Sequence, residues 1–234
     1  MSLLVSGLDS FYGPAQILHG VSIEVGRGEV VALVGRNGAG KSTTFRSIMG
    51  LVADRRGEIR YGAADLSRLP AYEIARCGIG YVPEDRRIFT DLTVEENLLV
   101  GRRPRREGVP EWTPARLYEL FPNLGQMPRR LGGRMSGGEQ QMLTIARTLM
   151  GNPSVVLLDE PSEGLAPKIV EEMAVAILKL KAEGLSILVS EQNLHFARLI
   201  ADRVCVIESG FIRYTGAMSH LAADQAILAE YLAL

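Results

Sequence analysis

GRNGAGKST, from Gly35 to Thr43, is the stretch of sequence that decides the fold of this chain. It matches the pattern G-x-x-x-x-G-K-[ST], in which backbone N–H groups surround nucleotide phosphates and a lysine adds positive charge. The apolar run Val30–Val34 precedes it, and residues 43–49 favour a helix. A strand, a glycine-rich loop and a helix in this order predict a phosphate-binding loop rather than an accidental turn. We expect phosphate contacts from Gly35, Arg36, Asn37, Gly38, Ala39, Gly40, Lys41, Ser42 and Thr43.

Composition limits the class of protein. The chain has 234 residues, 47% hydrophobic and 23% charged, and a formal net charge of -1. These values are typical of a soluble globular protein, and a near-neutral charge disfavours a nucleic-acid partner. Cys77 and Cys205 lie far apart, which argues against a zinc site or a disulfide framework and favours reduced thiols in a cytosol. No apolar run approaches the roughly 20 residues that span a bilayer, and the N-terminus lacks a secretory signal pattern.

Strand patterns at both ends of the chain enclose a helical middle. Segments 3–8, 21–25 and 57–61 predict short antiparallel strands. Between Thr93 and Met150 helix signals replace them, starting with a capping box of Thr93 and Glu96. The arginine-rich run 101–114 is interpreted as a solvated loop in preference to a phosphate-reading patch. One further strand is expected before the helical middle, at 79–82. After it the α/β pattern returns, with strands expected at 155–158, 186–189, 203–208 and 211–214 and helices at 168–182 and 194–200.

A second motif places two carboxylates at the end of a buried strand. VVLLDEPS runs from Val155 to Ser162, and its four apolar residues lead directly into Asp159 and Glu160. Asp159 is expected to bind Mg²⁺ beside Ser42, and Glu160 to polarise an attacking water as general base. With a phosphate loop upstream in the same α/β layout, a chance pairing of acids is the weaker interpretation.

A third motif, MSGGEQQMLTIARTLM from Met135 to Met150, opens a helix with Ser136, Gly137 and Gly138. Free N–H groups and the helix dipole favour an anion at such an end. One γ-phosphate cannot easily meet both this helix and the phosphate loop within one subunit, so we expect a head-to-tail pair in which Ser136 completes its neighbour's site. An ordinary N-cap serine with flexible glycines is the alternative.

The ordered set GRNGAGKS, SGGEQQ and VVLLDEPS resembles the ATPase subunit of an ATP-binding cassette (ABC) transporter, over roughly residues 3–216. The resemblance implies an α/β P-loop NTPase core, mainly a parallel sheet flanked by helices, with an N-terminal antiparallel β subdomain and a helical subdomain. It implies one domain, 1–234, divided into a core of 1–87 and 151–216, a helical subdomain 88–150 with the signature motif, and a short helical tail 217–234. It also implies ATP and Mg²⁺, a nucleotide-sandwich dimer, and stacking of Tyr12 on adenine.

The runs YVPEDRRIF, LTVEENLLVG, EPSEGLAPKIVEE and VSEQN resemble one branch of this family, the ATPases of branched-chain amino-acid uptake systems. Glu84 stands where most cassettes have a Mg²⁺-sensing glutamine, and Gln192 where most have a switch histidine. Ala166 replaces an aspartate, and Asp85 a usual glycine. We expect Glu84 to contact Mg²⁺, Lys41 and Glu160 to carry hydrolysis, and Gln192 to position the γ-phosphate without a titrating proton.

The function implied is ATP hydrolysis that drives import through a partner permease, with branched-chain amino acids as the favoured cargo. The partners implied are polytopic permease subunits, a second ABC ATPase (a copy or a paralogue) and, indirectly, an extracytoplasmic solute-binding protein, with no nucleic acid. The place implied is the cytoplasmic face of the membrane, as a peripheral subunit. Alternatives are urea or short amides, more distantly a lipid exporter, and a non-transport cassette, which the single cassette and the missing coiled coil disfavour.

Overall fold

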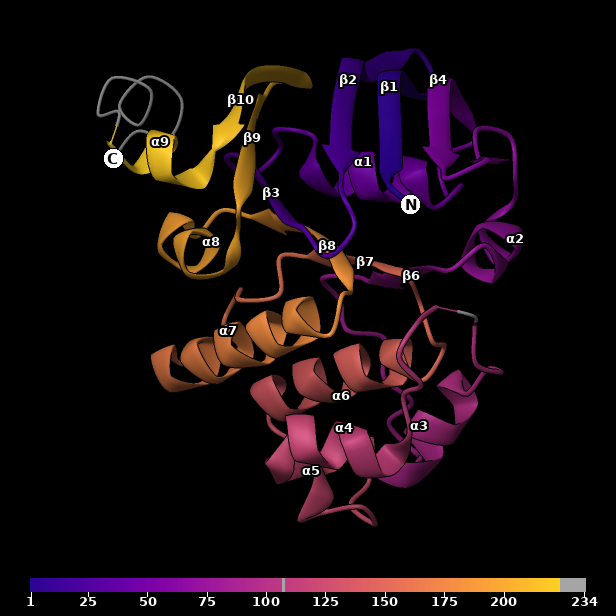
Figure 1. Cartoon of the computed structure of the whole chain (residues 1–234), viewed down its shortest axis with the longest axis vertical. Helices are drawn as coiled ribbons and strands as arrows, with labels where there is room; N and C mark the ends of the chain where they lie inside the picture. The colour runs from indigo at the N-terminus through magenta and orange to yellow at the C-terminus, as the bar shows by residue number, and fades with distance from the viewer. Residues whose placement is uncertain (107, 224–234) are drawn as a thin grey trace.

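The computed structural model describes residues 1–106 and 108–223, and its strands form two sheets (Figure 1). The first is antiparallel, in the order β2-β1-β4-β5, and consists of β1 (Leu3–Tyr12), β2 (Ala15–Val25), β4 (Asp54–Tyr61) and β5 (Ala64–Asp65). The second has the order β10-β9-β3-β8-β7-β6 and consists of β3 (Val30–Val34), β6 (Ile79–Val82), β7 (Val155–Asp159), β8 (Ser186–Glu191), β9 (Arg203–Glu208) and β10 (Phe211–Ala217).

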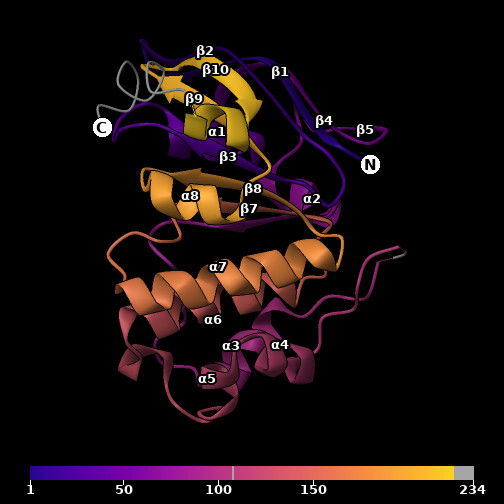
Figure 2. The same cartoon turned by 60° about the vertical axis from the view of Figure 1, so that its left-hand side comes forward.

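Helices cover both sheets and form a separate layer below them in Figure 1. Those between or beside the sheets are α1 (Lys41–Ile48), α2 (Ala71–Arg76), α7 (Pro167–Ala182), α8 (Leu194–Ile200) and α9 (Met218–Ala223). Those of the helical layer are α3 (Val94–Gly101), α4 (Pro114–Leu120), α5 (Pro122–Gly125), the 3-10 turn η1 (Gly132–Arg134) and α6 (Gly137–Leu149). Figure 2 shows α7 and α6 side by side, between the second sheet and the rest of this layer.

The second sheet separates two apolar cores because its strands alternate. Val30, Ala32 and Val34 of β3 face the core built with α6, α7 and α8. Val31 and Leu33 face the core shared with α1 and the antiparallel sheet. Consecutive strand residues point to opposite faces, so a strand covered on both sides is apolar throughout. The uninterrupted runs VVALV and VVLLD therefore fit only the interior of the sheet.

Parallel pairing brings the functional loops to one edge. β3 is parallel to β8 and β9, and β7 is parallel to β6 and β8. The carboxyl ends of these strands consequently meet, and they lead into the glycine-rich loop from β3, Glu160 from β7 and Gln192 from β8. Ligands of open α/β sheets bind at this edge.

The sequence prediction of an α/β fold is confirmed, and most elements lie where they were expected. β3, β6, β9 and α8 have the expected bounds, and α3 begins with the Thr93–Glu96 capping box. The three N-terminal strands are longer than expected, because Gly7, Gly20 and Gly57 adopt positive φ inside them and register shifts interrupt the alternation in β1. Apolar periodicity alone stops at such bulges, although the ladder continues.

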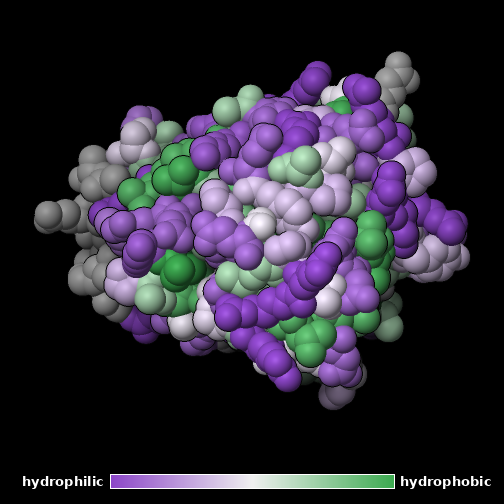
Figure 3. Space-filling view, turned by 90° about the horizontal axis from the view of Figure 1, so that it is seen from below, coloured by the Kyte–Doolittle hydropathy of each residue, from purple (hydrophilic) through white to green (hydrophobic). Residues whose placement is uncertain are grey.

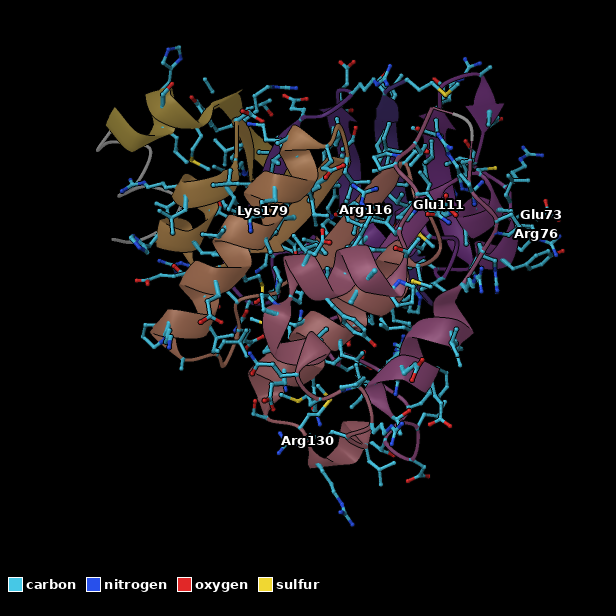
Figure 4. The ribbon with its side chains drawn as sticks, turned by 60° about the horizontal axis from the view of Figure 1, so that its bottom comes forward. Glu73, Arg76, Glu111, Arg116, Arg130 and Lys179 are labelled. Atoms are coloured by element: carbon cyan, nitrogen blue, oxygen red, sulfur yellow. The ribbon has the colours of Figure 1, made fainter. Side chains whose placement is uncertain are left out.

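The described parts of the arginine-rich segment, 101–106 and 108–114, lie mainly on the surface, as expected. Arg102, Arg103 and Arg105 are exposed, whereas Arg106 donates hydrogen bonds to the carbonyls of Ala75 and Arg76 at the end of α2. In Figure 4, Arg116 of α4 and Lys179 of α7 lie on adjacent helices, and a cavity that both residues line lies between them. Seen from below, this face is mostly hydrophilic, with smaller apolar patches (Figure 3).

The predicted tail, 217–234, falls mostly outside the described residues. Its first part forms α9, and residues 224–234 are not described. Within the two described ranges, no helix is long and apolar enough to cross a membrane.

Candidate active site

The glycine-rich loop forms a cradle at the carboxyl end of β3. Gly40 caps α1 with φ 111, and a Cβ there would lie 2.8 Å from Leu18 Cδ2. A Cβ on Gly35 would lie 2.3 Å from the carbonyl oxygen of Ile207. Both positions therefore require glycine, for backbone conformation at Gly40 and for close approach at Gly35. The N-terminus of α1 leaves N–H groups free for an anion.

A cavity of about 290 Å³ lies over this cradle, and part of the predicted set of contact residues borders it. It is lined by Tyr12, Ile17, Gly38, Gly40, Lys41, Ser42, Thr43 and Glu160. Tyr12 ends β1 and is 46% exposed, so its ring is accessible to a planar group. Three predicted features, the aromatic, the loop and the carboxylate, thus border one space, which fits a nucleotide.

Lys41 occupies the cavity floor with all its donors engaged. Its Nζ donates to the carbonyls of Gly35 at 2.7 Å and Arg36 at 2.9 Å, and it lies 3.1 Å from Glu160 Oε1. Lys41 and Glu160 are 3% and 8% exposed. The two predicted catalytic residues, Lys41 and Glu160, are therefore in direct contact.

Asp159 is fixed by three hydroxyl groups. Ser42 donates to Asp159 Oδ1 at 3.0 Å and Ser190 donates to the same oxygen at 2.7 Å. Tyr81 donates to Oδ2 at 3.1 Å. Burial and the neighbouring Asp159 raise the pKa of Tyr81, which keeps its proton available for this bond. The carboxylate can therefore neither rotate nor leave the end of β7 without losing hydrogen bonds.

The donor set at Ser42 and Asp159 fits Mg²⁺. A hydroxyl and a carboxylate oxygen already meet, and Mg²⁺ prefers oxygen ligands, with one or two carboxylates completed by phosphates and water. Among the described residues no group of three or more His, Cys, Asp or Glu side chains could hold a metal alone. When bound, Mg²⁺ supplies neutralisation of phosphate charge.

Glu160 has a backbone conformation that is rare for its residue type. Its φ is 46, in the left-handed region, which costs a non-glycine residue about 1–2 kcal/mol. Both the carbonyl oxygen and the side-chain Oγ of Ser190 accept from its N–H, each at 3.1 Å. The end of β8 therefore holds this strained residue in place.

Glu84 lies among other carboxylates. It is exposed, and its pKa is raised by partial burial and by Glu163, Glu160 and Asp159. The predicted metal contact is thus close enough to sense these charges. The turn next to Glu84 does not require a glycine at position 85, because Arg86 and Arg87, and not Asp85, take the left-handed conformation, at φ 60 and φ 48.

Gln192 and the SGG motif do not line the cavity. Gln192 is exposed at the end of β8. Ser136 is the N-cap of α6 and forms a capping box with Glu139, while Gly138 packs where a Cβ would lie 2.8 Å from Ile169. This capping is what the alternative interpretation, an ordinary N-cap serine, predicts for Ser136. Contact of Ser136, Gly137, Gly138 and Gln192 with nucleotide stays a prediction.

Sequence reasoning missed three residues of the site: Tyr81, Ser190 and Glu191. The first two hold Asp159, and Glu191 accepts from Ser162 and Asn193. Burial raises the pKa of Glu191 to about 7. The sequence signal that could have identified these residues is their place in the predicted strands, because each lies at or next to the carboxyl end of a strand in the parallel part of the sheet.

The comparisons with known proteins agree with this geometry. Residues 18–163 match the family model described as ABC transporter. The chain is 45% identical over 205 residues to the high-affinity branched-chain amino acid transport ATP-binding protein BraG of Pseudomonas aeruginosa, covering 88% of each chain. It is 35% identical to the lipopolysaccharide export system ATP-binding protein LptB of Haemophilus influenzae, covering 99% of this chain and 98% of LptB.

A solved structure, the ADP conformation of MJ1267, an ATP-binding cassette of an ABC transporter, superposes with a TM-score of 0.81. It is 26% identical, and the match covers 97% of both chains. The family match includes the phosphate loop, the SGG motif and the Asp159–Glu160 pair. The chain therefore belongs to the ABC transporter family, as one of its ATP-hydrolysing subunits.

Proposed function

We propose that this subunit hydrolyses ATP for an importer of branched-chain amino acids. The observation that carries the proposal is its 45% identity to BraG, against 35% to LptB. The runs around Glu84 and Gln192 support it, because they resemble the same branch. Tyr12 would stack on adenine, the loop from Gly35 to Thr43 would hold the phosphates, and Ser42, Asp159 and Glu84 would hold Mg²⁺.

In this proposal Glu160 is the general base and Lys41 exchanges partners. The ion pair would open when a γ-phosphate takes Lys41, which frees the Glu160 carboxylate to accept a proton from water. Gln192 would donate a hydrogen bond to a phosphate oxygen. The distribution of the residues supports this, since one cavity gathers the loop, Lys41 and Glu160.

The site would be completed by a second ATPase subunit. The residues around the cavity do not include Ser136, Gly137 or Gly138, and α6 lies in the helical layer, away from α1 (Figure 1). A head-to-tail pair would bring this helix end to the neighbouring nucleotide. Binding of ATP by both partners would close the pair, and its hydrolysis would reopen it. We place the subunit on the cytoplasmic face of a membrane, attached to permease subunits.

The test is co-purification with a candidate permease of this importer class, followed by reconstitution in liposomes. We expect ATP-dependent uptake of labelled leucine, isoleucine or valine with the solute-binding protein, and none with Glu160→Gln. Uptake of urea but not leucine would move the cargo to the runner-up, urea or short amides. ATPase stimulation by lipopolysaccharide alone would favour lipid export, the candidate that the full-length match to LptB supports.

A further inference from the structure

Glu191 is a buried carboxylate for which the hydrolysis scheme above has no use. It is the last residue of β8 and 2% exposed. A buried carboxylate is costly unless hydrogen bonds satisfy it. Its side chain accepts three: from Ser162 N at 3.1 Å, Ser162 Oγ at 2.9 Å and Asn193 N at 3.3 Å. Its own carbonyl accepts from Gly35 N at 3.3 Å.

These four bonds reach three different loops. Gly35 begins the phosphate loop, Ser162 lies two residues after Glu160, and Asn193 follows Gln192 and caps α8. Glu191 is thus a single residue bonded to the phosphate loop, to the loop after Glu160 and to the segment after Gln192. Three of the bonds end on the side-chain carboxyl group and one on the backbone carbonyl, so displacement of any of the three loops breaks a hydrogen bond to Glu191.

The hydrogen bonds between Glu191 and Ser162 lie next to the strained residue Glu160. Ser190 binds the N–H of Glu160 on one side, and Glu191 binds the N–H and hydroxyl of Ser162 on the other. The left-handed residue therefore lies between two anchors from the end of β8. Such strain persists only where the surroundings over-determine it. Without the second anchor, the segment 160–162 could relax, and the carboxylate would move relative to Lys41.

We propose that Glu191 is a positioning residue for hydrolysis, which holds the strained Glu160 loop in its productive conformation and couples it to the segment that carries Gln192. The inference rests on the proposed role of Glu160 as base. Glu191 itself touches no part of the cavity, because it is absent from the cavity lining and contacts the site only through Ser162, Asn193 and Gly35.

The variants that test it are Glu191→Ala, Glu191→Gln and Ser162→Ala, measured in the full chain. Steady-state ATPase gives kcat and KM, and calorimetry with ADP and Mg²⁺ gives the nucleotide Kd. We expect Glu191→Ala to lower kcat at least tenfold, with KM and Kd within threefold of wild type. The kcat of Glu191→Gln should lie between those of the wild type and Glu191→Ala, because the amide oxygen still accepts from Ser162. The double variant Glu191→Ala/Ser162→Ala should be no slower than Glu191→Ala alone, since both remove the same contact.

Glu29→Gln is the matched control. Glu29 accepts from Gly26 N at 2.7 Å and pairs with Arg203, so it also holds a loop, but at the opposite end of the sheet. It should keep kcat within twofold. Equal loss of kcat in Glu29→Gln and Glu191→Ala at equal loss of stability would overturn the proposal, as would unchanged kcat in Glu191→Ala.

Hydrogen exchange gives a readout that does not depend on turnover. Amides of residues 160–163 should exchange at least tenfold faster in Glu191→Ala and at the wild-type rate in Glu29→Gln; unchanged exchange in Glu191→Ala would contradict the proposal. Glu160→Gln separates the two hypotheses. If it abolishes turnover while Glu191→Ala does not, the base assignment stands and the positioning role is wrong. If it retains turnover within a few-fold, the base assignment itself is wrong.

Discussion

The buried pair of Lys41 and Glu160 predicts that removing either partner has unequal effects on stability. At 3.1 Å and an effective dielectric of about 20, the gross attraction is about 5 kcal/mol. Removing one partner of a buried pair costs about 3–5 kcal/mol when the other charge is left alone. What remains around each charge after the substitution therefore decides the cost.

The two charges are left in different surroundings. After Glu160→Gln, the Lys41 ammonium keeps the carbonyls of Gly35 and Arg36, at 2.7 and 2.9 Å. After Lys41→Met, the Glu160 carboxylate keeps no hydrogen bond that the structure records within the described residues. We therefore expect Lys41→Met to lower the free energy of unfolding by about 3 kcal/mol and Glu160→Gln by about 1 kcal/mol. The double variant should cost about 1–2 kcal/mol less than the sum of the two.

The assay is urea unfolding of the nucleotide-free chain in EDTA, followed by circular dichroism. Arg60→Met is the control, because Arg60 and Glu58 form an ion pair of similar length, 3.2 Å, but are 47% and 50% exposed. Such an exposed pair contributes less than about 1 kcal/mol. A cost of Glu160→Gln equal to or above that of Lys41→Met would refute the reasoning, as would strict additivity in the double variant.

Three further predictions concern neighbouring features. Ala166 caps α7 without a side-chain hydrogen bond. Ala166→Asp should therefore raise the unfolding free energy by about 1 kcal/mol, and Tm by about 2–4 °C in a thermal scan. Ala166→Val, which adds no acceptor, should raise neither. Gly40→Ala should weaken ADP binding more than tenfold by calorimetry, because of φ 111 and the contact with Leu18; binding within twofold would contradict the cradle geometry. Glu191, whose pKa is raised by burial from 4.5 to about 7, binds its proton more tightly in the folded state, so stability should fall by about 3 kcal/mol as pH rises from about 4.5 to 7, and Glu191→Gln should lack that slope in urea titrations.

The fold could be predicted from the sequence because its signals are local. The run VVALV before a glycine-rich loop, and VVLLD before Glu160, each identify a buried parallel strand without knowledge of its neighbours. The antiparallel strands were predicted too short, since bulges at Gly7 and Gly57 break the alternation that identifies a strand. Their full length depends on pairing with other strands, which no local pattern contains.

The site was predictable only where a motif fixes the chemistry. Ser42, Asp159 and Glu160 have assigned places in their motifs, and the structure brings them together with Lys41. Tyr81 and Ser190 carry no such pattern, because their hydroxyls meet Asp159 across strands that are 78 and 31 residues away in the sequence. Those contacts follow from the strand order β8-β7-β6, which is a property of the sheet.

Because Gln192 replaces the usual histidine, hydrolysis would be expected not to depend on pH near neutrality. The neighbouring residue, Glu191, changes that expectation. Gln192 cannot titrate, but Glu191 has a pKa of about 7 and bonds to the loop of Glu160. Hydrolysis should therefore show an inflection near neutral pH that persists in Gln192→Ala and disappears in Glu191→Gln. A profile that loses its inflection in Gln192→Ala, or keeps it in Glu191→Gln, would place the titrating group elsewhere. The expected response to pH therefore comes from Glu191, which bonds to the loop of Glu160, and not from Gln192, which carries no titratable proton.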